Sequence, residues 1–190
     1  MSQKRPDPRV TRSREALLAG ALDELAAVGY AAFSMESVAA RAGVGRSTLY
    51  RHWGDRLQLI ADALETLNVQ PAPPDRPADE TAREHVEDLL RHLADALSRS
   101  RVSACLPALV HAAEQDAGVR EFLHGYSRRR RQALVDAIAE GTARGEFRPG
   151  DPDIGADALS GAVFYRRLMT AHPVRPDDVP VLVDAVLGRR

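Results

Sequence analysis

Residues 34–59 carry the pattern that most limits what this chain can fold into. They read SMESVAARAGVGRSTLYRHWGDRLQL, two short stretches with helical spacing joined by a tight turn at Gly43. In the first stretch Ser34 is placed to cap a helix, and apolar residues recur at i, i+3 and i+4 from Met35 onward. The second stretch carries hydroxyls, a tyrosine and arginines in place of a full apolar stripe. One bracing helix followed by one polar helix is the outline of a helix-turn-helix, whose second helix presents polar side chains to a DNA groove.

The elements of this segment also match a known family in type and in order. They are Phe33-Ser34-Met35, Val38-Ala39, Ala42-Gly43-Val44, Ser47-Thr48-Leu49-Tyr50, Trp53, Asp55-Arg56 and Leu59. On these residues the chain resembles the TetR family of bacterial transcriptional regulators, from about residue 11 to about residue 67. Gly45 departs from the pattern, because the family commonly has a serine or threonine there that could cap the second helix. Trp53 and Arg56 replace a phenylalanine and a lysine and keep their chemical type.

Helical spacing continues along the chain, so we expect an all-α fold. Low aromatic content (5%) and many alanines and leucines favour helix over sheet. Apolar periodicity with glycine and proline stops predicts about nine helices, over 10–28, 35–42, 46–52, 56–67, 79–98, 101–115, 118–143, 153–170 and 177–187. Thr11 or Ser13 is placed to cap the first helix, and Pro107 is expected in the first turn of its own helix.

Proline content divides the chain into domains. Residues 69–78 contain four prolines, which predicts a linker rather than a helix. We therefore expect a basic flexible arm at 1–9, a helix-turn-helix DNA-binding domain at 10–68 and a further helical domain at 79–190. The resemblance implies a three-helix DNA-binding domain, joined by a connecting helix to a C-terminal helical domain for ligand binding and dimerisation.

Basic residues gather at the N-terminal end of an otherwise balanced chain. The net charge is −1, but residues 1–56 carry +3 and the remainder carries −4. Five basic side chains precede residue 15, against Asp7 alone. This arm would be drawn to phosphate, although a solvated tail without a partner is an equal alternative for residues 1–8.

Several classes of protein are disfavoured by what the sequence lacks. The single cysteine, Cys105, excludes an internal disulfide and a cysteine-based zinc site. We find no apolar run of membrane-spanning length and no signal-peptide pattern, so we expect a cytoplasmic, nucleoid-associated protein. His85 and His92 lie seven residues apart, but no HExxH pair, nucleophile elbow, phosphate loop or dinucleotide fingerprint occurs. We therefore expect no enzymatic activity, no metal and no cofactor.

Residues 46–52 are the candidate recognition helix, since a major groove about 12 Å wide admits one α-helix. Arg46 could read guanine near the helix start, and the resemblance implies a phosphate contact for Tyr50. The residues expected at double-stranded DNA are Thr11, Arg12, Ser34, Gly45, Arg46, Ser47, Thr48, Tyr50, Arg51, His52 and Arg56. Structural roles stay open for four of them: Thr11 could be a helix cap, Tyr50 could cover the core edge, Arg51 could be a solvated charge, and His52 could pack or cap.

A homodimer is expected, because one short helix reads only a few base pairs and a pseudo-palindromic operator needs two copies. Small residues over 155–162 would permit close helix approach, and the last helix is apolar on nearly every side. The expected interface residues are Ile154, Ala158, Gly161, Ala162, Val179, Leu182, Val183 and Val186. Burial of this surface within a monomer is the alternative.

The resemblance implies that the C-terminal domain binds a small-molecule effector between its helices and so respaces the recognition helices. Few polar groups stand at apolar positions there, which favours a mainly hydrophobic ligand. The candidate lining residues are Leu93, Cys105, Leu109, His111, Phe122, Tyr126, Phe164, Tyr165 and Met169. Each of these residues could instead be an ordinary core residue.

The arginine run at 128–131 is expected to be solvated or in ion pairs rather than on DNA.

Together these patterns predict a sequence-specific DNA-binding regulator, and the resemblance implies a repressor released from its operator by such a ligand. The alternative is a transcriptional activator or a ligand-independent regulator of the same fold.

Overall fold

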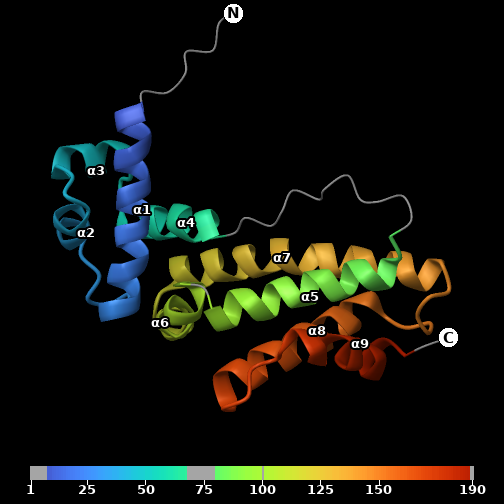
Figure 1. The fold of residues 1–190 in the computed structure, drawn as a ribbon. Coiled ribbons are helices and arrows are strands. Elements are labelled where there is room, and N and C mark those ends of the chain that lie inside the picture. The colour runs from blue at the N-terminus through green and yellow to red at the C-terminus, as the bar shows by residue number, and fades with distance from the viewer. Residues whose placement is uncertain (1–7, 68–79, 100, 189–190) are drawn as a thin grey trace, which may run out of the picture. The chain divides into compact units, whose positions relative to one another are not determined.

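The computed structural model describes residues 8–67, 80–99 and 101–188, and this part of the chain holds helices and turns but no strand (Figure 1). Its α-helices are α1 (Pro8–Val28), α2 (Met35–Ala42), α3 (Arg46–His52), α4 (Arg56–Leu67), α5 (Ala82–Arg99), α6 (Arg101–Gln115), α7 (Ala117–Ala143), α8 (Pro152–Met169) and α9 (Val179–Leu187). A short 3-10 helix, η1 (Pro176–Asp178), leads into α9. The all-α prediction is confirmed. Residues 1–7 of the predicted arm (1–9) and the predicted linker at 69–78 lie outside the described residues, whereas residues 8 and 9 belong to α1.

The helices form two compact units. The first contains α1 to α4, α6 and the start of α7 as far as Leu123, and the second contains α5, the rest of α7, α8 and α9. The sequence groups α6 with the C-terminal helices, whereas the structure packs α6 against α1 and α4. Cys105 and Leu109 on α6 are buried, and the Cys105 thiol donates a 3.5 Å hydrogen bond to the carbonyl oxygen of Leu22 on α1. By contact, α6 therefore belongs to the unit that holds the helix-turn-helix.

One face of α1 forms the centre of the first unit. The residues on this face, all at most 2% exposed, are Leu17, Leu18, Ala21, Leu22 and Leu25. Their helical spacing makes a continuous apolar stripe, against which α2 and α4 pack. Glu24 is also buried there, and Arg41 on α2 neutralises it across 3.0 Å. That pairing matters because an isolated buried carboxylate is strongly unfavourable.

Local signals set the ends of the short helices as expected. The Ser34 Oγ accepts a 3.2 Å hydrogen bond from the backbone N–H of Ser37 and caps α2. Gly43 ends α2 with φ 64°, in the left-handed region that glycine adopts without steric cost. Asp55 caps α4 through a 2.9 Å hydrogen bond from the backbone N–H of Gln58. These ends fix the short turns on both sides of α3.

Two expected helix features are wrong. Helix α1 begins at Pro8, so Thr11 and Ser13 lie inside the helix and do not cap it. Pro107 lies in the interior of α6 and not in its first turn. Proline has no N–H to donate to the carbonyl four residues earlier, so α6 tolerates one missing backbone hydrogen bond at that point.

In the second unit, α5, α8 and α9 pack together. Arg83 on α5 pairs with Asp184 on α9. Arg131 on α7 pairs with Asp153 and Asp157 on α8, at 2.7 and 2.6 Å. For this member of the arginine run, the predicted ion pairing is confirmed. Salt bridges thus connect neighbouring helices around the apolar core of this unit.

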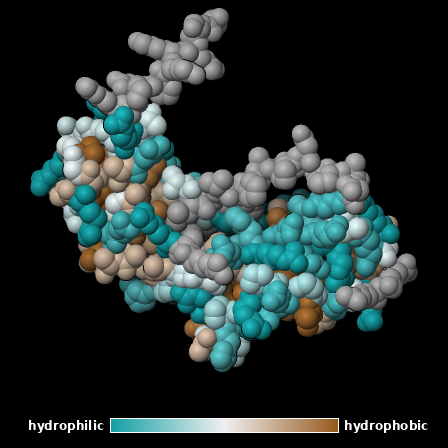
Figure 2. Space-filling view, in the orientation of Figure 1, coloured by the Kyte–Doolittle hydropathy of each residue, from teal (hydrophilic) through white to brown (hydrophobic). Residues whose placement is uncertain are grey.

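The surface of the second unit carries hydrophobic side chains over α8 and α9, visible at the lower edge of Figure 2 among mostly hydrophilic neighbours. The most exposed are Ile154 (65%), Tyr165 (62%) and Met169 (72%) on α8, and Val181 (69%) on α9. Single exposed apolar residues are ordinary on a protein surface, whereas large contiguous apolar patches often mark interaction sites. None of the described helices combines the length and the apolar character needed to cross a bilayer.

Candidate nucleic-acid interface

Helix α3 turns a polar face to solvent and an apolar face to the core. Arg46, Ser47, Tyr50, Arg51 and His52 are exposed, and Thr48 is half-buried. On the opposite side lie Leu49, fully buried, and Trp53, 3% exposed at the end of the helix. This division matches the face predicted from the sequence, and it leaves the side chains that can reach a base edge free of the core.

The start of α3 is uncapped by any side chain. Gly45 precedes the helix in an extended conformation, with φ −63° and ψ 140°, and makes no side-chain hydrogen bond to it. Its carbonyl oxygen accepts hydrogen bonds from the backbone N–H groups of Thr48 and Leu49. No capping side chain therefore bonds to the N–H groups of the first turn. Because Gly45 has no side chain, its backbone can approach another molecule closely.

Trp53 anchors the end of α3 to two other helices. Its indole Nε1 donates a 3.1 Å hydrogen bond to the Asp62 Oδ2 on α4. The same oxygen accepts a 2.7 Å charge-assisted hydrogen bond from Arg14 on α1, whose guanidinium lies 5.6 Å from the Trp53 ring centroid. The sequence did not predict the contact between Arg14 and Asp62, because the two residues are 48 positions apart and no local pattern indicates such a pair.

Tyr50 is held by a residue that the sequence analysis did not single out. Its hydroxyl donates a 2.7 Å hydrogen bond to the Glu36 Oε1 on α2, although the side chain is 47% exposed. That bond holds the pKa of the Glu36 carboxyl below its ordinary value and raises the pKa of the Tyr50 hydroxyl. Ser34 Oγ lies 3.3 Å from the other carboxylate oxygen of Glu36. Glu36 therefore connects the cap of α2 to the recognition helix.

Arg56, another residue predicted at DNA, packs inside the first unit. Its guanidinium donates a 3.2 Å hydrogen bond to the carbonyl oxygen of Tyr30 and lies 4.2 Å from the centroid of the Tyr30 ring. Thr11 and Arg12 are exposed on the first turns of α1. The structure places Gly45 directly before α3 and the predicted residues Arg46, Ser47, Thr48, Tyr50, Arg51 and His52 on it, and Glu36 joins Ser34 to Tyr50.

The predicted effector-lining residues are divided between the two units. Cys105, Leu109, His111 and Phe122 belong to the first unit, and Leu93, Tyr126, Phe164, Tyr165 and Met169 belong to the second. Tyr165 and Met169 point away from the core, as their exposure shows. Burial raises the pKa of the Cys105 thiol to about 11, so it is protonated at neutral pH. Cys105 thus behaves as a small apolar core residue.

The predicted dimer residues divide in a similar way. Ile154, Ala158 and Gly161 are exposed along one side of α8, and Ala162, Leu182 and Val186 are half-buried. Val179 and Val183 are fully buried, so their side chains fill the core of their own unit. Within the described residues, no group of three or more His, Cys, Asp or Glu side chains is placed to hold a metal ion.

The fold and the exposed face of α3 define a helix-turn-helix DNA-binding protein. Residues 17–63 match the profile of bacterial regulatory proteins of the tetR family, and residues 76–186 match the profile of the tetracyclin repressor-like C-terminal domain. The second match alone covers more than half of the chain. The chain therefore belongs to the TetR family of transcriptional regulators.

Individual relatives agree with this assignment. YdeS of Bacillus subtilis (strain 168), described as an uncharacterized HTH-type transcriptional regulator, is 29% identical over 189 residues, 96% of this chain and 92% of YdeS. The DNA-binding transcriptional repressor TetR of Mycobacteroides abscessus is 51% identical over 55 residues, 29% of this chain and 28% of that protein. The crystal structure of AibR in complex with isovaleryl coenzyme A and operator DNA shares the fold, with a TM-score of 0.69 at 20% identity over 94% of this chain and 100% of AibR. These relatives are regulators and not enzymes.

Proposed function

We propose that this regulator is a repressor, which binds a pseudo-palindromic operator as a homodimer and leaves it when a small, mainly hydrophobic effector binds. The exposed polar face of α3, backed by buried Leu49 and Trp53, carries the proposal. Repression is supported by the name of the Mycobacteroides abscessus relative, a transcriptional repressor. Because the target is operator DNA, the protein would work at the nucleoid in the cytoplasm.

Base reading is assigned to the first turn of α3. The exposed Arg46 has a fork of donors that suits the O6 and N7 acceptors of guanine. Ser47 and Thr48 follow it on the same turn, and Gly45 lets the backbone come close to the groove. Arg51 and His52 stand one turn later, where they would reach a base or a phosphate.

Phosphate contacts would fix the register of the protein on the duplex without reading sequence. Thr11 and Arg12 on α1 and Ser34 at the start of α2 are placed near helix N-termini, where anions are favoured. Tyr50 would exchange its hydrogen bond to Glu36 for one to a phosphate oxygen. Arg56 would have to leave Tyr30, at least in part, to do the same.

Dimerisation is assigned to the exposed sides of α8 and α9. Ile154, Ala158, Gly161 and Tyr165 recur at helical spacing along one side of α8, and Val181 is exposed on α9. A Cβ added at Gly161 would meet no atom within 4 Å, so this side of α8 is open to a close partner helix. A second copy, packed through the same two helices, would cover this surface in a four-helix arrangement.

Effector binding is assigned to the second unit, where Leu93, Phe164 and Tyr126 remain as candidate lining residues. His92 on α5 adds a polar contact that the sequence did not identify. Its Nε2 is a buried side-chain polar atom that has no hydrogen-bond partner within the described residues. A buried polar atom left unpaired costs about 1–3 kcal/mol, which a ligand hydrogen bond would recover. The structure of the neighbour AibR in complex with isovaleryl coenzyme A supports this part of the proposal.

The experiment is a selection of operator sequences from a random duplex pool, followed by a reporter assay with and without the gene. We expect one enriched pseudo-palindrome, and higher reporter expression when the gene is deleted. Lower expression after deletion would identify an activator, and no enrichment would overturn the proposed readout. A compound counts as an effector if it raises the Kd of the protein for the operator. The same compound should leave the Kd of the His92→Phe variant unchanged.

A further inference from the structure

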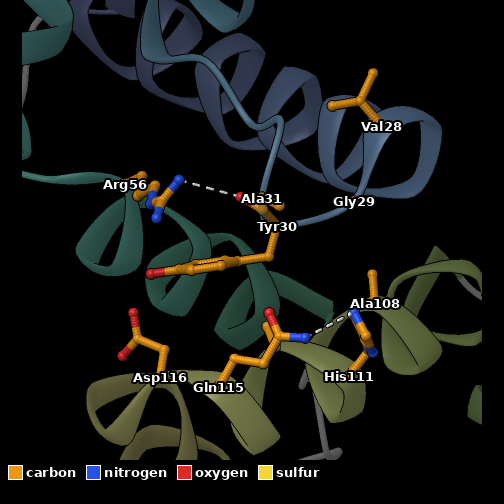
Figure 3. Close-up of a pocket in the computed structure, with 10 residues that line it drawn as sticks. Val28, Gly29, Tyr30, Ala31, Arg56, Ala108, His111, Gln115 and Asp116 are labelled. Carbon is orange, nitrogen blue, oxygen red and sulfur yellow. Dashed lines mark hydrogen bonds between the residues drawn. The ribbon is translucent and has the colours of Figure 1, made fainter.

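A pocket outside the proposed effector region opens inside the first unit (Figure 3). It has a volume of about 340 Å³ and lies between the end of α1 with the loop that follows, the start of α4, and the last turns of α6. Val28, Ala31, Ala108 and Ala112 give it an apolar wall. Every element around it belongs to the unit that holds the helix-turn-helix.

Two opposite charges stand on the walls of this pocket, and neither has an ionic partner in the described part of the chain. Arg56 gives one hydrogen bond to the Tyr30 carbonyl and stacks on the Tyr30 ring, which leaves further guanidinium donors unused. The Asp116 Oδ1 accepts hydrogen bonds from the backbone N–H groups of Gly118 and Val119 at the start of α7, which leaves the other oxygen free. In Figure 3 the two side chains lie on opposite sides of the Tyr30 ring.

Other polar side chains line the same pocket. Tyr30 is 8% exposed. His111 and Gln115 on α6 lie with their Nε2 atoms 3.3 Å apart. The pocket therefore presents donors at one end, a carboxylate at the other and a small apolar wall beside them.

We propose that this pocket is a second small-molecule site and that it binds a zwitterion with a short aliphatic group, of the class of the aliphatic amino acids. The ligand carboxylate pairs with the free donors of Arg56, since guanidinium and carboxylate match in geometry. The ligand ammonium pairs with Asp116, and the aliphatic group rests on the alanines of the wall. An anion without the ammonium would meet an uncompensated Asp116, and an amine without the carboxylate would meet an uncompensated Arg56.

A ligand in this pocket also changes DNA binding. Arg56 is one of the phosphate contacts of the proposed function, and its guanidinium cannot serve a buried carboxylate and a phosphate equally well at once. The ligand therefore weakens operator binding, and by linkage the operator weakens ligand binding to the same degree. This consequence rests on the proposed function, whereas the binding of the zwitterion does not.

The binding test uses the full-length protein without DNA and three probes of nearly equal size. The probes are L-leucine, 4-methylpentanoate, which lacks the ammonium, and 3-methylbutylamine, which lacks the carboxylate. We expect L-leucine to shift the amide resonances of Gly29, Ala31, Ala112 and Gln115 with saturation in the millimolar range, and each truncated probe to bind at least about tenfold more weakly. No saturable shifts with L-leucine, or equal shifts with all three probes, would overturn the proposal.

Two variants remove the charges separately. Asp116→Asn keeps an oxygen that can accept the N–H groups of α7, and Arg56→Gln removes the guanidinium. We expect Asp116→Asn to lose the preference for L-leucine over 4-methylpentanoate, and Arg56→Gln to lose both ligands. Glu121→Gln and Arg120→Gln, on α7 outside the pocket, are the controls and should bind as the natural sequence does. Unchanged L-leucine binding in both pocket variants would place the ligand elsewhere.

The DNA test measures Kd for the selected operator with and without L-leucine. We expect a higher Kd in its presence. If L-leucine shifts the amide resonances saturably but the Kd for the operator does not change, the pocket binds the ligand and the proposed effect on DNA binding is refuted. No operator binding under either condition would instead refute the proposed function, because the resonance shifts do not depend on DNA.

Discussion

The hydroxyl of Tyr50 on α3 donates a 2.7 Å hydrogen bond to the Glu36 carboxylate on α2. The bond connects the two helices of the helix-turn-helix on their exposed side, whereas Leu49 and Trp53 fix α3 on the buried side. A phenol has one proton to donate, so Tyr50 cannot give this proton to Glu36 and to a phosphate at the same time. In the free protein, the Tyr50 hydroxyl thus donates its proton to Glu36, and the proposed phosphate contact would require this hydrogen bond to break.

Tyr50→Phe should weaken operator binding about equally for all sequences, because a phosphate contact positions the protein without reading bases. The change also removes the Glu36 contact on an exposed surface, so the fold should remain intact. Titration of operator and scrambled duplexes, with circular dichroism as the check on folding, measures both effects. Unaltered Kd values for both duplexes would show that Tyr50 does not contact phosphate.

Arg46→Ala should behave differently. If Arg46 reads guanine, its loss should cost about 1–3 kcal/mol of operator binding and relax the preference at one base pair of each half-site. Arg128→Ala is the matched control, since Arg128 is an exposed arginine on α7 in the second unit. Repeating the sequence selection with each variant tests this. A uniform loss with no change in preference would make Arg46 a phosphate contact.

Val181→Glu should convert the dimer to a monomer. The valine is 69% exposed on α9, so the charge would be harmless in a monomer but would be desolvated in the proposed interface. Val10→Glu, at 44% exposure on α1, is the control and should leave the dimer unchanged. Light scattering after size exclusion gives the mass. Persistence of the dimer in both Val181→Glu and Ile154→Glu would move the interface away from α8 and α9.

Gly141→Ala should destabilise the second unit by about 1–3 kcal/mol, as overpacking of a filled core does. A Cβ at this position would collide with the ring of Phe147, which is 1% exposed and has no room to move. Gly125→Ala on the same helix is the comparison, because its new methyl would meet only the end of the Arg129 side chain. That variant should gain about 0.5–1 kcal/mol from helix propensity. Chemical denaturation of both variants measures the difference.

Asp178 should contribute to stability in a pH-dependent way. Hydrogen bonds from Arg175, followed by the charge of Arg166, lower the pKa of Asp178 to about 2 from its ordinary 3.8. A carboxyl with a depressed folded-state pKa stabilises the protein above its unfolded pKa, and this contribution is lost as the pH falls from about 4 towards 2. Asp178→Asn should therefore be less stable than the natural sequence at pH 7, with a difference that shrinks below pH 4. Chemical denaturation of both proteins at pH 7 and below pH 4 measures this trend, and a deficit that does not shrink at low pH would contradict it.

The sequence was sufficient for features that depend on neighbouring residues. The cap at Ser34, the left-handed turn at Gly43 and the cap at Asp55 follow from local hydrogen bonding and backbone freedom. The exposed and buried sides of α3 follow from helical periodicity, because only one spacing places Leu49 and Trp53 on the same side.

Tertiary structure alone decided which apolar faces meet. Periodicity marks α6 as a helix with a buried side, but only the fold shows that Cys105 meets Leu22 on α1. Val179 and Val183 were expected to face a second subunit, and they lie in the core of their own unit instead. Arg56 and Asp116, 60 residues apart in the chain, line one pocket. The apolar periodicity of a helix predicts which of its sides is buried. Which other element covers that side is determined by packing across the whole unit.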